Sequence, residues 1–265
     1  MYDFHLHTTF SFDAKSSPKG VIKTAIEKNF KAICFTDHLD YDANIYYKDY
    51  DFDIDEYFKT MSELRDKYRD KIEVLIGAEF GVQPSLYEKY DKIAKAYPLD
   101  FVLLSIHTVE HHDLAKDGFP EKYEPLEVLK RYYGQMARCV KEFDDFDILG
   151  HIDYIDRYFK DKSRMPEFKD YRDYVAEVFE NVIKKDKGIE LNSAGRRRGL
   201  DYFHPKKEAL ELYYEMGGRV LTFGSDAHVE IDFGKNFDEV IEIAKSIGFK
   251  ELCIYRNRQR DFVKI

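Results

Sequence analysis

Residues 101–107 read Phe-Val-Leu-Leu-Ser-Ile-His, an apolar run of strand length that ends in a histidine. Similar runs recur along the chain, and each is followed by a longer segment with apolar residues at three- and four-residue spacing. Short β-rich runs that alternate with helical periodicity are typical of βα units around a largely parallel sheet. We therefore expect an α/β protein.

Seven βα units are expected from this pattern. Their strands are Tyr2–His7, Ala32–Thr36, Glu73–Ala78, Phe101–Ile106, Asp147–Gly150, Gly188–Asn192 and Arg219–Phe223. The segments between them are expected to be helices, among them Pro18–Asn29, Ile54–Asp70, Pro125–Phe143, Tyr171–Lys187, Pro205–Met216 and Phe237–Ser246. Glu251–Tyr255 is a candidate eighth strand. Because no linker-like stretch interrupts the units, we expect one domain over residues 1–265, and a closed or nearly closed barrel fits better than an open sheet.

The composition excludes several classes of protein. With 21 Tyr and 21 Phe among 265 residues, the chain has ample aromatic surface for a core, so disorder is not expected. No apolar run approaches the roughly 18 residues of a membrane span. The net charge of −9 argues against a general nucleic-acid binder. Three widely spaced cysteines and no visible signal peptide indicate a cytoplasmic protein.

The carboxyl ends of the expected strands carry an unusual set of side chains, and in a βα barrel the active site lies at these ends. Six of the seven ends carry His, Asp or Glu, and the other carries Asn192. These residues are His5, His7, Asp37, His38, Glu79, His107, His151, Asp226 and His228. Taken singly, each of these residues is explained equally well as a packed or a solvent-exposed side chain without a ligand. Their convergence at one end of one sheet, however, indicates a shared ligand. Imidazole and carboxylate groups together bind Zn²⁺, Mn²⁺ or Fe²⁺, so a multinuclear metal site is expected.

These motifs resemble those of the PHP (polymerase and histidinol phosphatase) family of metal-dependent phosphoesterases. The resemblance covers the whole chain, through His5-x-His7 with Asp13, Thr36-Asp37-His38, Gly77-Ala78-Glu79, Ser105-Ile106-His107, Gly150-His151 and Ser225-Asp226-Ala227-His228. It implies a distorted (β/α)7 TIM-like barrel, which the seven units would accommodate. It also implies that residues 1–265 form a single PHP metal-dependent phosphoesterase domain.

The resemblance further implies three divalent metal ions. The first would be held by His5, His7, Glu79 and Asp226, the second by Glu79, His107 and His151, and the third by Asp13, His38 and His228. Some family members have a histidine in place of Asp13, for which a turn residue is the other interpretation. The His-rich set favours Zn, Mn or Fe over Mg²⁺. The expected catalytic residues are Glu79, Asp226 and His228.

The expected reaction is hydrolysis, because no Ser or Cys nucleophile stands at a strand end. A metal-bridging hydroxide is then the expected nucleophile. Arginines are expected to bind the phosphoryl oxygens. The candidates are Arg157, which follows His151, and the run Arg196-Arg197-Arg198, in which the family pattern aligns best with Arg197. Arg196 also remains a candidate, because the pattern leaves open which arginine of the run points inward.

The substrate expected from the histidinol-phosphatase branch of the family is L-histidinol phosphate, cleaved to L-histidinol and phosphate in histidine biosynthesis. Residues 108–113 are a candidate loop for the imidazole and amino groups, although an exposed polar loop is favoured for His111 and His112. His204 is assigned to a helix start. The alternatives are a related phosphoesterase for a nucleotide, a sugar phosphate or an oligonucleotide, and a non-catalytic metal-binding barrel. The expected partner is a small phosphate monoester, without nucleic acid or membrane, and the pattern does not predict an oligomeric state.

Overall fold

The computed structural model describes residues 1–41 and 52–265. Within these residues, seven parallel strands form one sheet in chain order, and the short β3 (His38–Leu39) pairs beside them with β4. The seven are β1 (Tyr2–Asp3), β2 (Ala32–Phe35), β4 (Glu73–Gly81), β5 (Phe101–Ser105), β8 (Ile148–Leu149), β9 (Gly188–Asn192) and β10 (Leu221–Gly224). The α/β class expected from the alternating pattern is thereby confirmed.

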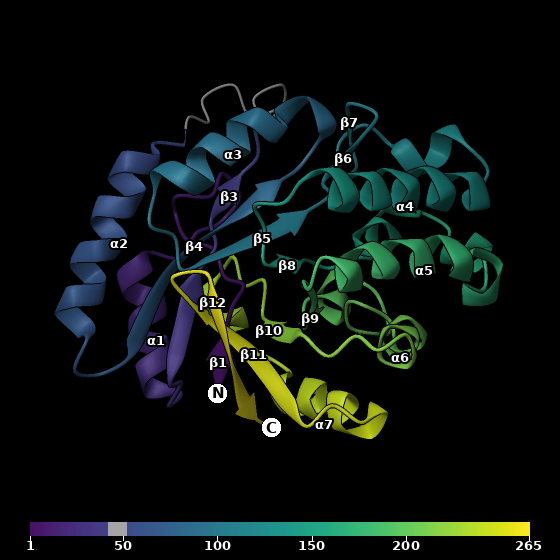
Figure 1. Ribbon diagram of the computed structural model, residues 1–265. Coiled ribbons are helices and arrows are strands. Elements are labelled where there is room, and N and C mark those ends of the chain that lie inside the picture. The colour runs from purple at the N-terminus through teal and green to yellow at the C-terminus, as the bar shows by residue number, and fades with distance from the viewer. Residues whose placement is uncertain (42–51) are drawn as a thin grey trace.

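The sheet curves until its first and last strands meet (Figure 1). The Phe4 amide donates to the carbonyl of Phe223 at 2.9 Å, and the Asp226 amide donates to the carbonyl of His5 at 2.7 Å. A parallel bridge joins Leu6 to Ala227. These bonds make a nearly closed barrel of seven parallel strands, as expected.

The first strand is shorter than expected, because β1 ends at Asp3 and not at His7. Beyond Asp3, hydrogen bonds from backbone amides to side chains replace some of the backbone hydrogen bonds between neighbouring strands. The Asp3 carboxylate accepts from the amides of His5 and Ser225, and the Thr36 hydroxyl accepts from the amide of Leu6. The segment that carries His5 and His7 is therefore held between its two neighbours by side-chain as well as backbone bonds.

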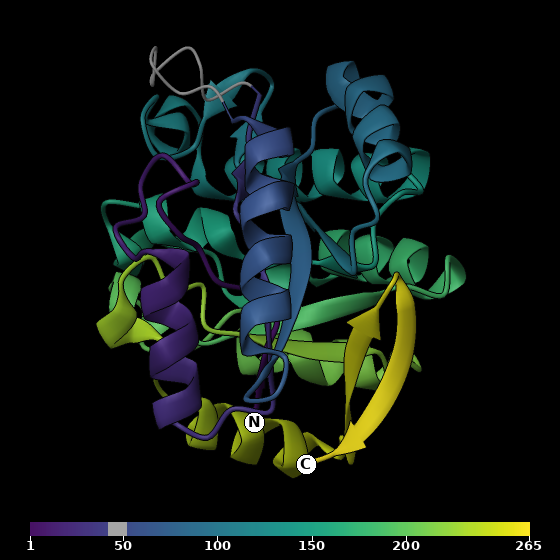
Figure 2. The same ribbon diagram turned by 90° about the vertical axis from the view of Figure 1, so that its left-hand side faces the viewer.

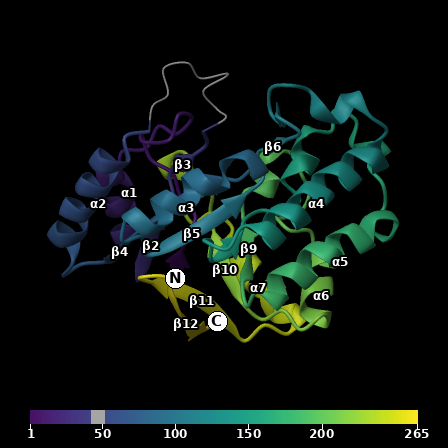
Figure 3. The same ribbon diagram turned by 45° about the horizontal axis from the view of Figure 1, so that its top comes forward.

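Helices cover the outside of the barrel (Figures 1 and 3). They are α1 (Pro18–Glu27), α2 (Ile54–Tyr68), α3 (Tyr87–Ala96), α4 (Pro125–Glu142), α5 (Phe168–Lys184), α6 (Lys207–Glu215) and α7 (Phe237–Ile247). The expected helix start at Pro205 is wrong by two residues, because the Lys206 amide donates to Asp153 instead of entering the helix. No helix in the described ranges has both the length and the apolar content needed to cross a membrane.

The candidate eighth strand is not part of the barrel. It forms β11 (Glu251–Arg256), which pairs antiparallel with β12 (Gln259–Lys264) in a separate two-stranded sheet. Asn257 and Arg258 make the turn with φ of 49° and 62°, as two-residue hairpins require. Figure 2 shows this hairpin at the end of the molecule where both termini lie.

The hairpin closes the amino-terminal end of the barrel. Cys253, Ile254 and Tyr255 are buried in a cluster with inward-facing strand residues, and the Tyr255 ring lies 5.3 Å from that of Phe101. Arg258 Nε donates to Asp147 at 2.5 Å. With this end filled by apolar side chains, the opposite end of the barrel is the one left for a site.

Candidate metal centre

Glu79 stands at the middle of the carboxyl end of the barrel, on the long β4, and is fully buried. Its Oε2 lies 3.4 Å from His5 Nε2 and 3.5 Å from His7 Nε2. Its Oε1 lies 3.3 Å from His107 Nε2 and 2.9 Å from His151 Nε2. One carboxylate thus faces imidazoles from both sides, which is the arrangement that a bridging ligand needs.

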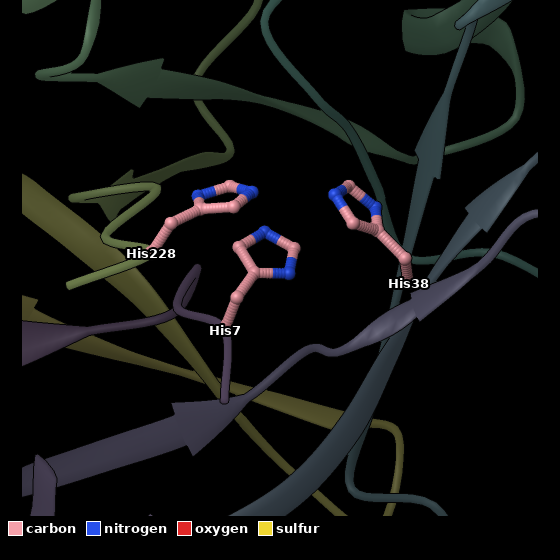
Figure 4. A group of neighbouring side chains, drawn as sticks. All are labelled: His7, His38 and His228. Carbon is pink, nitrogen blue, oxygen red and sulfur yellow. The ribbon is translucent and has the colours of Figure 1, made fainter. Parts of the chain in front are cut away.

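A second group of imidazoles adjoins the first. The rings of His7, His38 and His228 point toward one another from three separate segments (Figure 4). The ring centroid of His7 lies 4.2 Å from that of His38 and 4.2 Å from that of His228. Asp13 lies beside this group, with Oδ2 3.2 Å from His228 Nε2 and Oδ1 3.6 Å from His38 Nε2.

Asp226 connects the metal-ligand candidates with a cation. Its Oδ1 lies 3.6 Å from His7 Nε2 and 3.9 Å from His5 Nε2, while its Oδ2 accepts from Arg157 Nη2 at 3.0 Å. The backbone of Asp226 has φ of 51°, a left-handed conformation that is uncommon for a residue with a side chain. Strain of this kind is concentrated at functional sites. The structure therefore brings all nine predicted metal ligands together.

Four of these histidines are anchored by the ring nitrogen that faces away from the centre. The anchoring pairs are His5 Nδ1 with Glu190 Oε1 (2.7 Å), His107 Nδ1 with Asp40 Oδ2 (2.8 Å), His7 Nδ1 with Ser11 Oγ (3.1 Å) and His228 Nδ1 with the carbonyl of Asp226 (3.1 Å). A proton on the outer nitrogen leaves the Nε2 lone pair pointing inward. This is the tautomer that a metal ligand requires.

The closest pair of inward nitrogens tests whether cations fit. The Ser11 hydroxyl donates to Asp37 at 2.7 Å, so its oxygen accepts from His7 Nδ1. His5 Nδ1 likewise donates to Glu190. The Nε2 lone pairs of His5 and His7 then face each other at 3.0 Å, which is repulsive unless a proton or a cation lies between them. This donor set fits divalent ions of the zinc, manganese and iron type.

The charge of the centre favours the same conclusion. Burial alone would raise the pKa of Glu79, but His5, His38 and His107 hold it well below its usual range. Burial would also raise the pKa of Asp13, and the nearby His38 and His228 lower it to about 2. Both carboxylates are therefore ionised. Burial lowers the pKa of His5, whereas Glu190 and Glu79 raise it to a net value well above normal, so protons and cations compete for its Nε2.

The centre opens into a cavity of about 340 Å³. Asp13, His38, His107, His151, Asp226 and His228 line it on the metal side. Phe12, Tyr154 and Tyr158 add aromatic walls, and Thr108 and Asp113 come from the hairpin of β6 (Thr108–Val109) and β7 (His112–Asp113). His111 is exposed at the tip of this hairpin, as favoured from the sequence.

Arg157 lies where the sequence predicts, whereas Arg196 and Arg197 lie away from the cavity lining. Arg157 lines the cavity with its side chain only 7% exposed. Arg196 and Arg197 do not line it: Arg196 pairs with Glu239, and Arg197 donates to the carbonyl of Ser225. Arg198 is the member of the run that lines the cavity. The run forms a short 3-10 turn, so consecutive side chains leave the backbone in different directions.

Two acidic residues near the centre and one histidine were not anticipated. Asp40 and Glu190 hold His107 and His5, respectively. The two-residue periodicity of strands is a signal for both, since Glu190 lies two residues before Asn192 and Asp40 two residues after His38. The assignment of His204 to a helix start is wrong, because His204 is fully buried and its Nε2 accepts from Arg157 Nε at 2.9 Å.

Similar proteins are found over nearly the whole chain. A family model described as PHP domain matches residues 3–194. A probable histidinol-phosphatase of Clostridium acetobutylicum is 33% identical over 257 residues, covering 94% of this chain and 95% of that protein. The histidinol-phosphatase of Lactococcus lactis subsp. lactis is 27% identical over 268 residues, covering 98% and 96%. The crystal structure of a Lactococcus lactis histidinol phosphate phosphatase, complexed with zinc, L-histidinol and phosphate, matches with a TM-score of 0.86 at 26% identity and covers 98% of each chain.

Proposed function

The chain belongs to the PHP-domain family, and from this premise we propose that it is a histidinol-phosphatase that hydrolyses L-histidinol phosphate to L-histidinol and inorganic phosphate. One observation carries the proposal. The cluster of inward imidazoles and carboxylates opens into the same cavity as a buried arginine, in a chain similar along its length to histidinol-phosphatases. The enzyme is metal-dependent.

The metal ligands are assigned as the sequence predicts. His5, His7, Glu79 and Asp226 would hold one ion, and Glu79, His107 and His151 a second. Asp13, His38 and His228 would hold a third. When bound, such cations supply positive charge to the phosphoryl oxygens and make a hydrolytic water nucleophilic at neutral pH. The pairs of adjacent imidazoles and the buried carboxylate of Glu79 support this assignment.

The residues of the chain itself hold the phosphoryl group. Arg157 presents its positive charge and its Nη1 donors to the phosphoryl oxygens, and Arg198 adds a second positive charge at the exposed rim of the cavity. Asp226 holds Arg157 in place through its Oδ2. We propose Glu79, Asp226 and His228 as the catalytic residues. Arg197 has a supporting role, because it donates to the carbonyl of Ser225, the residue before Asp226.

The remainder of the cavity suits the histidinol moiety. Tyr158 provides an aromatic surface for an imidazole ring, and Asp40 and Asp113 provide negative charge for an ammonium group. A site that binds both groups discriminates against a phosphate ester that lacks them, because its own buried polar groups are then left unpaired.

We also propose the setting in which the enzyme works. Its partner is a small phosphate monoester rather than nucleic acid, in keeping with the net charge of −9. Its three cysteines are free and buried, which suits a reducing cytoplasm. Residues 1–265 are proposed to form one domain, since β10, which completes the barrel, lies beyond the residues that the PHP model matches.

Phosphate release from a panel of esters tests the function. We expect kcat/KM for L-histidinol phosphate to exceed that for AMP or a simple alkyl phosphate by at least about 100-fold, the scale of two lost polar contacts. Activity should vanish with a chelator and return with Zn²⁺ or Mn²⁺. Equal values across the panel would keep a metal-dependent phosphatase but remove the histidinol assignment. A preference for AMP or an oligonucleotide would point to another activity of the same family, and no release from any ester would favour a non-catalytic barrel.

A further inference from the structure

Arg157 is held on two sides, and only one of them faces the metal ligands. Its Nη2 donates to Asp226 at 3.0 Å, and its Nε donates to His204 Nε2 at 2.9 Å. Its Nη1 has no hydrogen bond to any residue in the described ranges. The guanidinium carbon lies 4.7 Å from the centre of the Tyr154 ring. Two edges and one face of the guanidinium are thus fixed by the protein, which leaves the Nη1 edge for a phosphoryl group.

His204 is itself held rigidly. Its Nδ1 lies 2.5 Å from Asp153 Oδ1, and the side chains of both residues are 0% exposed. Asp153 Oδ2 also accepts from the Lys206 amide at 2.7 Å. The backbone of His204 is paired with Asn192 at the end of β9. The imidazole therefore has neither the space nor the partners to adopt another orientation.

The tautomer of His204 follows from these partners. The ionised Asp153 accepts only, so Nδ1 carries the proton and Nε2 presents a lone pair. Arg157 Nε donates only, so it needs that lone pair. Because Arg157 Nε donates to His204 Nε2, that nitrogen carries no proton, and the ring is neutral with its proton on Nδ1. The three side chains are therefore compatible with one arrangement of protons, in which His204 donates from Nδ1 to Asp153 and accepts at Nε2 from Arg157.

We propose that His204 is a positioning residue for the reaction: oriented by Asp153, it fixes the guanidinium of Arg157 in the plane in which Nη1 meets the phosphoryl oxygens. This inference rests on the proposed function, because it assumes that the cavity binds phosphate. A guanidinium held at Nε cannot turn about its long side chain, so less rotamer freedom is lost when phosphate binds. The rival interpretation is that His204 and Asp153 form only a buried polar pair that stabilises the loop before α6.

Two substitutions at position 204 separate these interpretations. His204→Asn places an amide near the Nδ1 position, where it can donate to Asp153, but it loses the acceptor for Arg157. His204→Gln reaches the Nε2 position, where its carbonyl can accept from Arg157, but it loses the donor to Asp153. The measurements are kcat/KM with L-histidinol phosphate, the affinity of the zinc-loaded protein for inorganic phosphate by calorimetry, zinc content and Tm. Each variant is also made in an Arg157→Ala background.

We expect His204→Asn to lower kcat/KM and phosphate affinity by about 10- to 100-fold, the usual scale for the partner of a site residue. His204→Gln should recover most of both, and zinc content should not change. When Arg157 is already replaced by Ala, adding His204→Asn should lower kcat/KM and phosphate affinity by less than about 2-fold further. The reason is that the effect of His204 on both quantities is exerted through Arg157. Equal losses in both variants, or a full loss in the Arg157→Ala background, would overturn the proposal in favour of a structural role.

If the position 204 variants do not fold, Asp153→Asn provides a second test of the proposal. The amide can donate to Nδ1 and so permits the other tautomer, whose Nε2 proton would oppose Arg157 Nε. A loss of phosphate affinity that disappears in the Arg157→Ala background supports the inference, and an additive loss contradicts it. If the unmodified protein binds phosphate but does not hydrolyse L-histidinol phosphate, the proposed function fails while the affinity measurements still decide the role of His204. If the zinc-loaded protein does not bind phosphate, both fail.

Discussion

The two ends of the barrel both bury carboxylates, yet they satisfy them in opposite ways. At the amino-terminal end, Asp100 accepts from the amides of Ile76 and Asn257, and Asp147 accepts from the Val102 amide and from Arg258. At the carboxyl end, Glu79 is surrounded by imidazole nitrogens: His5 Nε2, His7 Nε2 and His38 Nδ1 all lie within 3.5 Å of its Oε2, at 3.4, 3.5 and 2.8 Å. A buried carboxylate whose oxygens all accept hydrogen bonds stabilises the fold. A buried carboxylate that faces the unprotonated nitrogens of imidazoles requires a cation between them.

The largest expected effect comes from Glu79→Gln at the carboxyl end. The amide keeps the size of the side chain but removes the negative charge that two cations would share. We expect metal content to fall below that of the unmodified protein and kcat/KM to fall by about three orders of magnitude. Elemental analysis and steady-state kinetics measure both. Full metal content with near-normal turnover would show that Glu79 does not bridge.

The next effect concerns the two arginines that line the cavity. Arg157→Ala and Arg198→Ala should each lower kcat/KM, with the larger loss, about 2–3 kcal/mol of transition-state stabilisation, for the buried Arg157. Arg198 is exposed at the rim, so its loss should be smaller. Kinetics with L-histidinol phosphate provide the measurement, and unchanged metal content is the control. A greater loss for Arg198 than for Arg157 would reverse this assignment.

At the amino-terminal end, Arg258→Ala should affect stability and not catalysis. It removes a partner of the buried Asp147 and one of the contacts that fasten the C-terminal hairpin. Because the arginine is 23% exposed, we expect a loss of about 1–3 kcal/mol in the free energy of unfolding. Denaturant unfolding gives the value, and kcat/KM should stay within about 2-fold of normal. A large catalytic loss in a fully folded variant would contradict the separation of the two ends.

The smallest effect is expected for Arg196→Ala, within the same run as Arg198. Its guanidinium pairs with Glu239 on the surface and lies 4.4 Å from the centre of the Phe203 ring. An exposed pair of this kind contributes little, so both kcat/KM and Tm should remain near normal. If Arg196→Ala impaired catalysis as much as Arg198→Ala, the side of the turn that faces the substrate would have to be reassigned.

The sequence by itself predicted the barrel and the residues that the structure brings together in the candidate centre. Strand-length apolar runs, helical spacing and the residue at each strand end are local features, and parallel strands in one barrel bring all their carboxyl ends to the same side. His5, Glu79 and His228 could therefore be placed together although they are far apart in the chain. Residues 42–51 lie outside the described residues and carried none of the predicted ligands.

Only the tertiary structure decided what depends on contacts between distant segments. Glu251–Tyr255 has the composition of a barrel strand, but it pairs with β12 because β1 and β10 already complete the ring. The arginine of the run that faces the cavity depends on competing partners, since Glu239 and the Ser225 carbonyl take Arg196 and Arg197. His204 likewise acquires its neighbours Asp153 and Arg157 from a different loop. A long or buried polar side chain points to whichever partners the fold brings within hydrogen-bond distance, and a local pattern contains no record of them.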